Sequence, residues 1–149
     1  MFVDEILQKK GHDVFTIRPT ASVREAVQRL SLERVGGLVV SEDGERLQGI
    51  ISESEIIRSL ARHGANLLDE RVSDVMMQSV STCAPGDKLK SVMAVMTQKR
   101  VRHMPVLERG RLCGIVSIGD IVKHRLEDLE LKDAVMRDAY IMRGSSKSP

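Results

Sequence analysis

The sequence has 149 residues and a mass of 16.6 kDa, which allows one domain or two very small ones and excludes a large multidomain enzyme. Its hydrophobic content of 42% suffices for an ordinary core, whereas only 2% aromatic residues argue against a binder that stacks single-stranded bases. With 23 basic and 21 acidic residues, the formal net charge of +2 is too balanced for a general binder of polyanions.

The first half of the chain alternates extended and helical patterns. Residues 14–17 are rich in β-branched side chains and predict a short strand that ends before Pro19. Ser22 and Glu25 have the spacing of a helix capping box, and apolar residues continue at helical spacing, so a helix is expected to about residue 33. Strands at 38–40 and 47–51, a turn at 42–44 and a helix from Ser52 complete this half.

The second half repeats this order after a connecting segment. Residues 64–79 carry Val72, Val75 and Met76 at helical spacing and predict a short helix there. Asp87 is expected to cap the next helix. Strands near 104–107 and 112–116 should then flank a turn at 108–110.

A long helical pattern runs from Asp120 to about Met142, which is more than a half-domain of this size needs. Such an overhanging amphipathic helix either packs against another chain or folds back on its own domain. Residues 144–149 predict a disordered tail.

The two halves are related by a nearly constant offset. Pairs 66 positions apart are Val14 and Val80, Thr16 and Thr82, Pro19 and Pro85, Val35 and Val101, Val40 and Val106, and Gly44 and Gly110. After the loss of one residue in a turn, Gly49, Ser52 and Ile56 match Gly114, Ser117 and Ile121, 65 positions later. Neither half buries much core alone, so we expect one pseudo-symmetric unit.

Each half also places a serine at the end of a strand and a carboxylate three residues later, at the start of a helix. These pairs are Ser52 with Glu55 and Ser117 with Asp120. The free N–H groups of a helix N-terminus attract phosphate, and a carboxylate one turn away suits ribose hydroxyls. The same spacing is that of a capping box, which needs no ligand. Spacing alone leaves both interpretations open.

These motifs, in this order, resemble a tandem pair of CBS domains, named from cystathionine beta-synthase and also called a Bateman module. The resemblance is carried by Gly49-Ile50-Ile51-Ser52, Gly114-Ile115-Val116-Ser117, Val72-Ser73-Asp74-Val75-Met76 and Arg102-His103-Met104-Pro105-Val106. It implies an α+β fold of two pseudo-symmetric repeats, each a small sheet with two packed helices. The expected parts are a first repeat at 1–65, a connecting helix or linker at 66–79, a second repeat with an extended C-terminal helix at 80–143, and the tail at 144–149.

The resemblance further implies that an adenosine-containing ligand binds in clefts between the repeats. In the second cleft, Asp120 would hold the ribose hydroxyls, Ser117 a phosphate oxygen, and Thr82 would line the adenine. Arg102 and His103, followed by Met104 and Pro105, would face the phosphates. The counterparts in the first cleft are Thr16, Gly36, Gly37, Ser52 and Glu55. Because Glu55 replaces the more usual Asp and the two glycines carry no charge, the second cleft ranks above the first.

The expected function is therefore that of a regulatory module without catalytic residues. The resemblance implies AMP as the foremost ligand, with ATP, ADP or NAD(H) as alternatives, a homodimer of paired modules, and an effector protein that senses occupancy. If His103 titrates near 6.5, nucleotide binding should strengthen as the pH falls toward 6.

Other function classes are less favoured. A ligand-free dimeric scaffold built on the terminal helix is the main alternative. Nucleic-acid binding through Arg100, Arg102, Arg109 and Arg111 is less favoured, and an enzyme is less favoured still. No metal site is predicted, because the histidines lack ligand spacing and Cys83 and Cys113 form no CxxC motif. No apolar stretch reaches the length of a membrane span, and a cytoplasmic protein is expected.

Overall fold

The computed structural model describes the backbone of residues 1–147 and the side chains of residues 1–141. Over this part of the chain the helices are α1 (Val3–Lys10), α2 (Val23–Glu33), α3 (Glu53–His63), the 3₁₀ helix η1 (Gly64–Asp69), α4 (Val72–Val75), α5 (Leu89–Lys99) and α6 (Ile118–Lys147). The strands are β1 (Thr16–Ile17), β2 (Gly37–Val40), β3 (Gly49–Ser52), β4 (His103–Glu108) and β5 (Arg111–Ser117).

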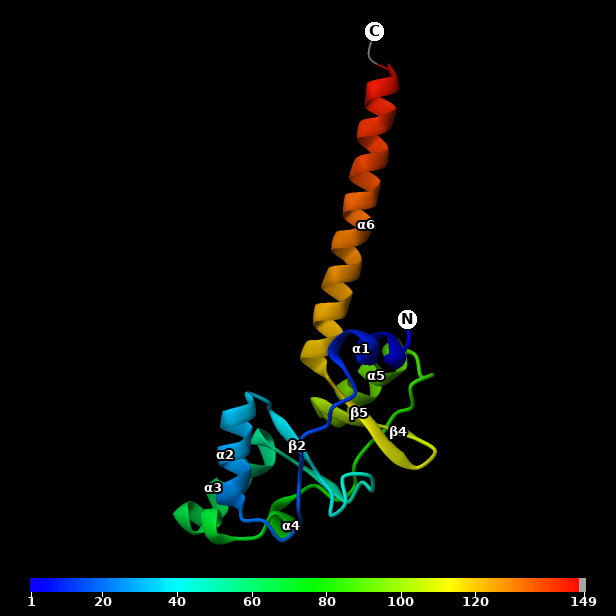
Figure 1. The fold of residues 1–149 in the computed structure, drawn as a ribbon. Coiled ribbons are helices and arrows are strands. Elements are labelled where there is room, and N and C mark those ends of the chain that lie inside the picture. The colour runs from blue at the N-terminus through cyan, green and yellow to red at the C-terminus, as the bar shows by residue number, and fades with distance from the viewer. Residues whose placement is uncertain (148–149) are drawn as a thin grey trace.

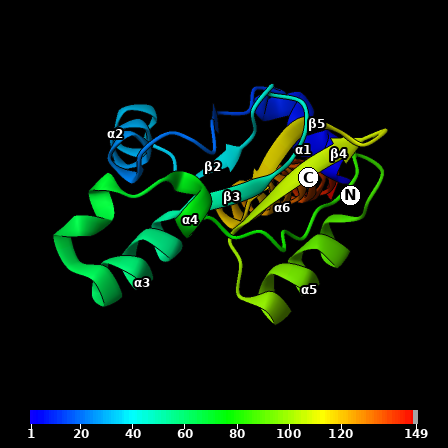
Figure 2. The same ribbon diagram turned by 90° about the horizontal axis from the view of Figure 1, so that it is seen from below.

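Each repeat contains a small sheet with helices packed beside it, which confirms the predicted α+β class (Figures 1 and 2). In the first repeat, β1 pairs parallel to β2, and β2 pairs antiparallel to β3. The second repeat has the antiparallel pair β4 and β5, and Cys83 pairs parallel with Val106 where the first repeat has Ile17 beside Val40. The two repeats therefore share one topology.

Most predicted elements are present with shifted ends. The first strand is confined to Thr16–Ile17, and the short helix of the connecting segment is α4. Asp87 does not cap α5, because its carboxylate accepts a hydrogen bond from the Ala84 N–H at 2.9 Å and Lys88 occupies the N-cap position. One helix was not predicted at all: α1, near the N-terminus.

The leading helix of each repeat packs into the core of the other repeat. Val3, Ile6 and Leu7 of α1 are buried among residues of α5, β4, β5 and α6 in the second repeat. Reciprocally, Val72 of α4 is fully buried in the core of the first repeat, among residues of α2, β2 and β3. Burying these side chains stabilises the contact between the repeats as well as each core.

Matching backbone hydrogen bonds fix this exchange at both positions. The N–H of Val3 donates to the Asp87 carbonyl at 2.9 Å, as the N–H of Val72 donates to the Ala21 carbonyl at 2.8 Å. The next residues repeat the relation: Asp4 donates to Pro85 at 2.9 Å, and Ser73 donates to Pro19 at 3.0 Å. The pseudo-symmetry read from the sequence thus extends to individual hydrogen bonds.

Helix α6 leaves the body of the molecule and projects from it (Figure 1). It continues to Lys147, whereas the sequence predicts an end near Met142 with a tail at 144–149, of which residues 148–149 lie outside the described residues. Within the described chain, no helix has the sustained hydropathy that crossing a bilayer requires.

Candidate functional site

A cleft of about 660 Å³ lies between the two repeats, a volume in the range of small-molecule sites. Its walls come from both repeats: the start of α3, the segment after α4, the loop between α5 and β4, and the start of α6. The cleft therefore exists only when the two repeats are packed together.

One carboxylate that lines the cleft belongs to Glu55, in the first turn of α3. Only 9% of this residue is exposed. Its Oε2 accepts a hydrogen bond from the Ser52 N–H at 2.9 Å and another from the Ser52 hydroxyl. The pair thus forms the predicted cap of α3, and both residues still line the cleft.

Cationic side chains also line the cleft. Arg58 comes from α3, whereas Lys99, Arg100 and Arg102 come from the end of α5 and the loop that follows it. Arg100 ends α5 in the left-handed conformation, with φ of 55°. This backbone turn leads the chain from α5 directly along the cleft, so several positive charges gather in one place.

His103, at the start of β4, lies against the backbone of the first repeat. A Cβ atom at Gly36 would lie 3.1 Å from the His103 ring, and one at Gly37 would lie 3.2 Å from it. The two glycines therefore make room for the imidazole. Burial lowers the pKa of His103 below its ordinary 6.5, by more than the nearby carboxylates of Glu53 and Glu55 raise it. His103 is therefore expected to become protonated at a lower pH than the value near 6.5 that the sequence alone predicts.

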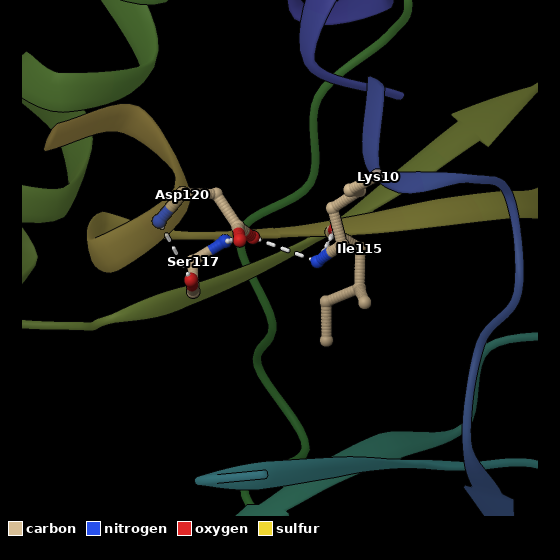
Figure 3. Close-up of polar contacts among 4 residues, drawn as sticks. All are labelled: Lys10, Ile115, Ser117 and Asp120. Carbon is tan, nitrogen blue, oxygen red and sulfur yellow. Dashed lines mark hydrogen bonds and ion pairs between the residues drawn. The ribbon is translucent and has the colours of Figure 1, made fainter. Parts of the chain in front are cut away.

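The second carboxylate, Asp120, has a different environment. Figure 3 shows it facing the ammonium of Lys10, the last residue of α1. Lys10 Nζ donates to Asp120 Oδ2 at 2.7 Å and to the Ile115 carbonyl at 2.9 Å. Asp120 Oδ2 also accepts the Ser117 N–H at 2.9 Å, and the Asp120 N–H donates to the Ser117 hydroxyl at 3.1 Å.

These contacts determine the charge state of Asp120. Burial acts to raise the pKa of its carboxyl, but the hydrogen bonds from Lys10 and Ser117 and the charge of Lys10 together outweigh it. The pKa of Asp120 therefore lies below 3.8, and the ion pair is complete at neutral pH.

The structure brings together only part of the residue set implied by the resemblance. The members of that set that line the cleft are Gly36, Ser52, Glu55, Arg102, His103 and Ser117. Met104 and Pro105 are buried in β4, and Gly37 is buried beneath the His103 ring. Asp120 borders a separate hollow beside Lys10, and Thr16 borders another beside Arg18 and Asp43.

Thr82 and Thr16 are not placed as the resemblance implies. The resemblance groups Thr82 with Asp120, but the residues just before Thr82, Val80 and Ser81, line the cleft that contains Glu55. The physical reason is the exchange of leading segments, which brings the start of each repeat to the carboxylate of the other. Thr82 itself is exposed and does not line the cleft.

Several cleft residues escaped prediction. Arg58, Lys99 and Ser81 line the cleft, and Lys10 reaches Asp120. Lys10 and Ser81 each precede a strand segment of their own repeat. Nothing in the sequence pattern indicates that these residues contact the other repeat. Among the described residues, no group of three His, Cys, Asp or Glu side chains is close enough to hold a metal ion.

Comparison with known proteins identifies the architecture. A family model described as "CBS domain" matches residues 3–62 and again residues 72–127. The chain belongs to the CBS domain family. The two matches begin at α1 and at α4, so each CBS repeat includes the helix that it exchanges with the other.

Solved CBS proteins have the same fold. The CBS-domain containing protein ATU1752 from Agrobacterium tumefaciens is 40% identical, with a TM-score of 0.81 over 84% of this chain and 99% of that one. The CBS domain pair of protein MJ0100, solved in complex with 5′-methylthioadenosine and S-adenosyl-L-methionine, is 23% identical, with a TM-score of 0.73 over 83% of this chain and 98% of that one.

A curated relative is longer than this chain. The mitochondrial CBS domain-containing protein CBSX3 from Arabidopsis thaliana is 34% identical over 128 residues, which are 80% of this chain and 62% of that protein. The shared part is the CBS pair.

Proposed function

We propose that this CBS pair binds an adenine nucleotide in the cleft between its repeats and acts as a regulatory sensor. The observation that carries the proposal is the arrangement of charge in that cleft. Glu55 offers a carboxylate to this cleft, and Arg58, Lys99 and Arg102 offer cations to it. A nucleotide has the matching polarity, with hydroxyl donors on the ribose and negative charge on the phosphates.

The cations favour a phosphorylated ligand. S-adenosylmethionine carries a sulfonium cation, which the cationic side chains that line this cleft would repel. AMP, ADP, ATP and NAD(H) all carry negatively charged phosphates, which these cationic side chains attract. AMP is the first ligand to test. The adenosine ligands of the MJ0100 pair support the adenosine part of the assignment.

A regulatory role is supported by the position of the cleft between the two repeats. A ligand held by both repeats binds more tightly to one relative arrangement of the repeats than to another. This difference in affinity is what allows a ligand to shift the equilibrium between the two arrangements. We propose that an effector protein senses this arrangement, and that two modules associate into a homodimer.

A panel of thermal unfolding measurements tests the binding proposal. AMP, ADP, ATP, NAD(H), S-adenosylmethionine and GTP are each added at millimolar concentration to wild type, Arg102→Ala and Arg125→Ala. Arg125 is exposed on α6 and does not line the cleft, so its variant loses the same charge elsewhere. A ligand at about 100 times its Kd stabilises by about 2.7 kcal/mol, or roughly 5–10 °C for a chain of this size.

We expect adenine nucleotides to raise the Tm of wild type and Arg125→Ala, and to raise that of Arg102→Ala less. If no ligand raises the Tm of wild type, the binding proposal is wrong. The second candidate, a ligand-free interaction module, would then stand on the exposed apolar residues of α6, among them Leu126, Leu129 and Met136.

A further inference from the structure

The two carboxylates that the repeat places at equivalent positions do not have equivalent surroundings. Glu55 lines the cleft between the repeats, whereas Asp120 does not, although its neighbours Ser117, Ile118 and Gly119 do. The hollow that Asp120 borders lies between α1 and α6 and is bordered also by Lys10 and His124. The cleft thus ends before it reaches the second carboxylate.

The difference arises where the leading segment of one repeat meets the strand of the other. In the first repeat, Ile50 exchanges two backbone hydrogen bonds with Met77, at 3.0 and 2.8 Å. In the second repeat, the carbonyl of the equivalent residue, Ile115, accepts from the side chain of Lys10 at 2.9 Å. A side-chain ammonium therefore stands where the other repeat has a peptide group.

Lys10 uses this position to reach the carboxylate. Its ammonium has three donors, of which one goes to Ile115 and one to Asp120 Oδ2 at 2.7 Å. The two side chains are 33% and 25% exposed, so the pair is partly shielded from solvent. The Lys10 charge also keeps the pKa of Asp120 low, so the carboxylate stays ionised and paired. Ribose hydroxyls would have to displace this ammonium to bind there.

We propose that Lys10 occupies the Asp120 position from within the chain, so that each CBS pair binds one nucleotide, at the Glu55 cleft. This inference rests on the proposed nucleotide binding and specifies which of the two equivalent positions is available. Lys10 is then the residue that determines the number of ligands, and removing its charge opens the second position.

Binding stoichiometry tests the inference directly. AMP and ATP are titrated by calorimetry into wild type, Lys10→Met and Lys9→Met. Methionine keeps the aliphatic length of Lys10 and removes the ammonium. Lys9 is its neighbour, is exposed and pairs with Glu127 at 3.5 Å rather than with Asp120, so its variant is the matched control. We expect one nucleotide per chain for wild type and Lys9→Met, and two for Lys10→Met.

The outcomes distinguish a failure of the role given to Lys10 from a failure of the proposed nucleotide binding. Two nucleotides on wild type, or one on a folded Lys10→Met, would overturn the role of Lys10 and leave nucleotide binding intact. No binding by wild type or by either variant would overturn both. Thermal unfolding without ligand first establishes that each variant is folded.

A second pair of variants works in the presence of Lys10, in case Lys10→Met does not fold. We expect Glu55→Gln to weaken the single binding event by about tenfold or more, because it removes a charged hydrogen-bond acceptor. Asp120→Asn should leave the affinity within about twofold, because the Asp120 side chain does not line the cleft and Asn keeps its size. Loss of binding on Asp120→Asn with little change on Glu55→Gln would place the nucleotide at the other carboxylate and overturn the inference.

Discussion

His103 lies at the contact between the two repeats, since its ring covers Gly36 and Gly37. Burial lowers the pKa of this ring below 6.5 in the folded state. Between the folded pKa and about 6.5, the unfolded chain therefore binds more protons than the folded one. Folding stability is lost as the pH falls through this window and is fully present above it.

We predict that the free energy of unfolding falls more between pH 7.5 and pH 5.5 in wild type than in His103→Gln. The other three histidines are present in both proteins, so the difference between the two pH profiles reports His103 alone. Urea unfolding at the two pH values, without ligand, measures it. Parallel profiles would show that the ring titrates alike in the folded and unfolded chain.

At the scale of the residue, sequence and structure agree where the interaction is local. Ser52 with Glu55 and Ser117 with Asp120 form the caps that their three-residue spacing predicts. Lys10 could not be found in this way, because its partner lies 110 residues away and a lysine at a helix end is ordinarily solvated. Only the packing of α1 on the other repeat places the two together.

At the scale of the element, the exchanged helices explain the glycine that starts each Gly-Ile-Ile/Val-Ser segment. A Cβ on Gly114 would lie 2.6 Å from Leu7 of α1. A Cβ on Gly49 would lie 2.6 Å from the sulfur of Met76 and 2.9 Å from the backbone oxygen of Met77, just after α4. Both glycines thus leave space for the segment that arrives from the other repeat.

We predict that Gly49→Ala lowers the free energy of unfolding by about 1–3 kcal/mol, because the methyl group must displace a backbone oxygen in a bonded β-bridge. Gly86→Ala is the matched control, since no atom lies within 4 Å of its added Cβ and its φ is not positive. That variant should stay within about 0.5 kcal/mol of wild type. Denaturant unfolding of both variants checks the prediction, and equal effects would contradict it.

The elements themselves could mostly be predicted, but not their partners. Apolar residues at helical spacing and the Ser22 cap indicate α2, and the alternation around Gly110 indicates the β4–β5 hairpin. Helix α1 was missed because eight residues with four charges give a weak pattern. Its three buried side chains pack on a core formed from residues 83–121, and this partner cannot be seen in the local pattern.

At the scale of the whole molecule, helix α6 projects from the body (Figure 1). It presents an apolar stripe without a partner in the described chain. Val122, Leu126, Leu129, Met136 and Tyr140 are between 46% and 78% exposed and recur at steps of three, four and seven residues. A single helix that extends into water is marginally stable, and this spacing is that of a helix pair.

We predict that the protein sediments as a dimer at micromolar concentration and that Leu126→Lys with Leu129→Lys shifts it toward the monomer. Two buried charges without partners oppose association. Leu131→Lys is the control, because Leu131 is 65% exposed but lies away from the stripe. Sedimentation velocity distinguishes the species. A wild-type monomer, or a double variant as dimeric as wild type, would rule out this face of α6 as the contact.

The exchange of leading helices also has a consequence for synthesis on the ribosome. Helix α1 is translated before most of the core that covers Ile6 and Leu7, which is complete only when Ile121 has been added, roughly a hundred residues later. At about 5–20 residues per second, the apolar face of α1 waits on the order of ten seconds for its partners. For that interval the nascent chain carries an uncovered hydrophobic segment, which makes α1 a natural point of contact for chaperones during translation.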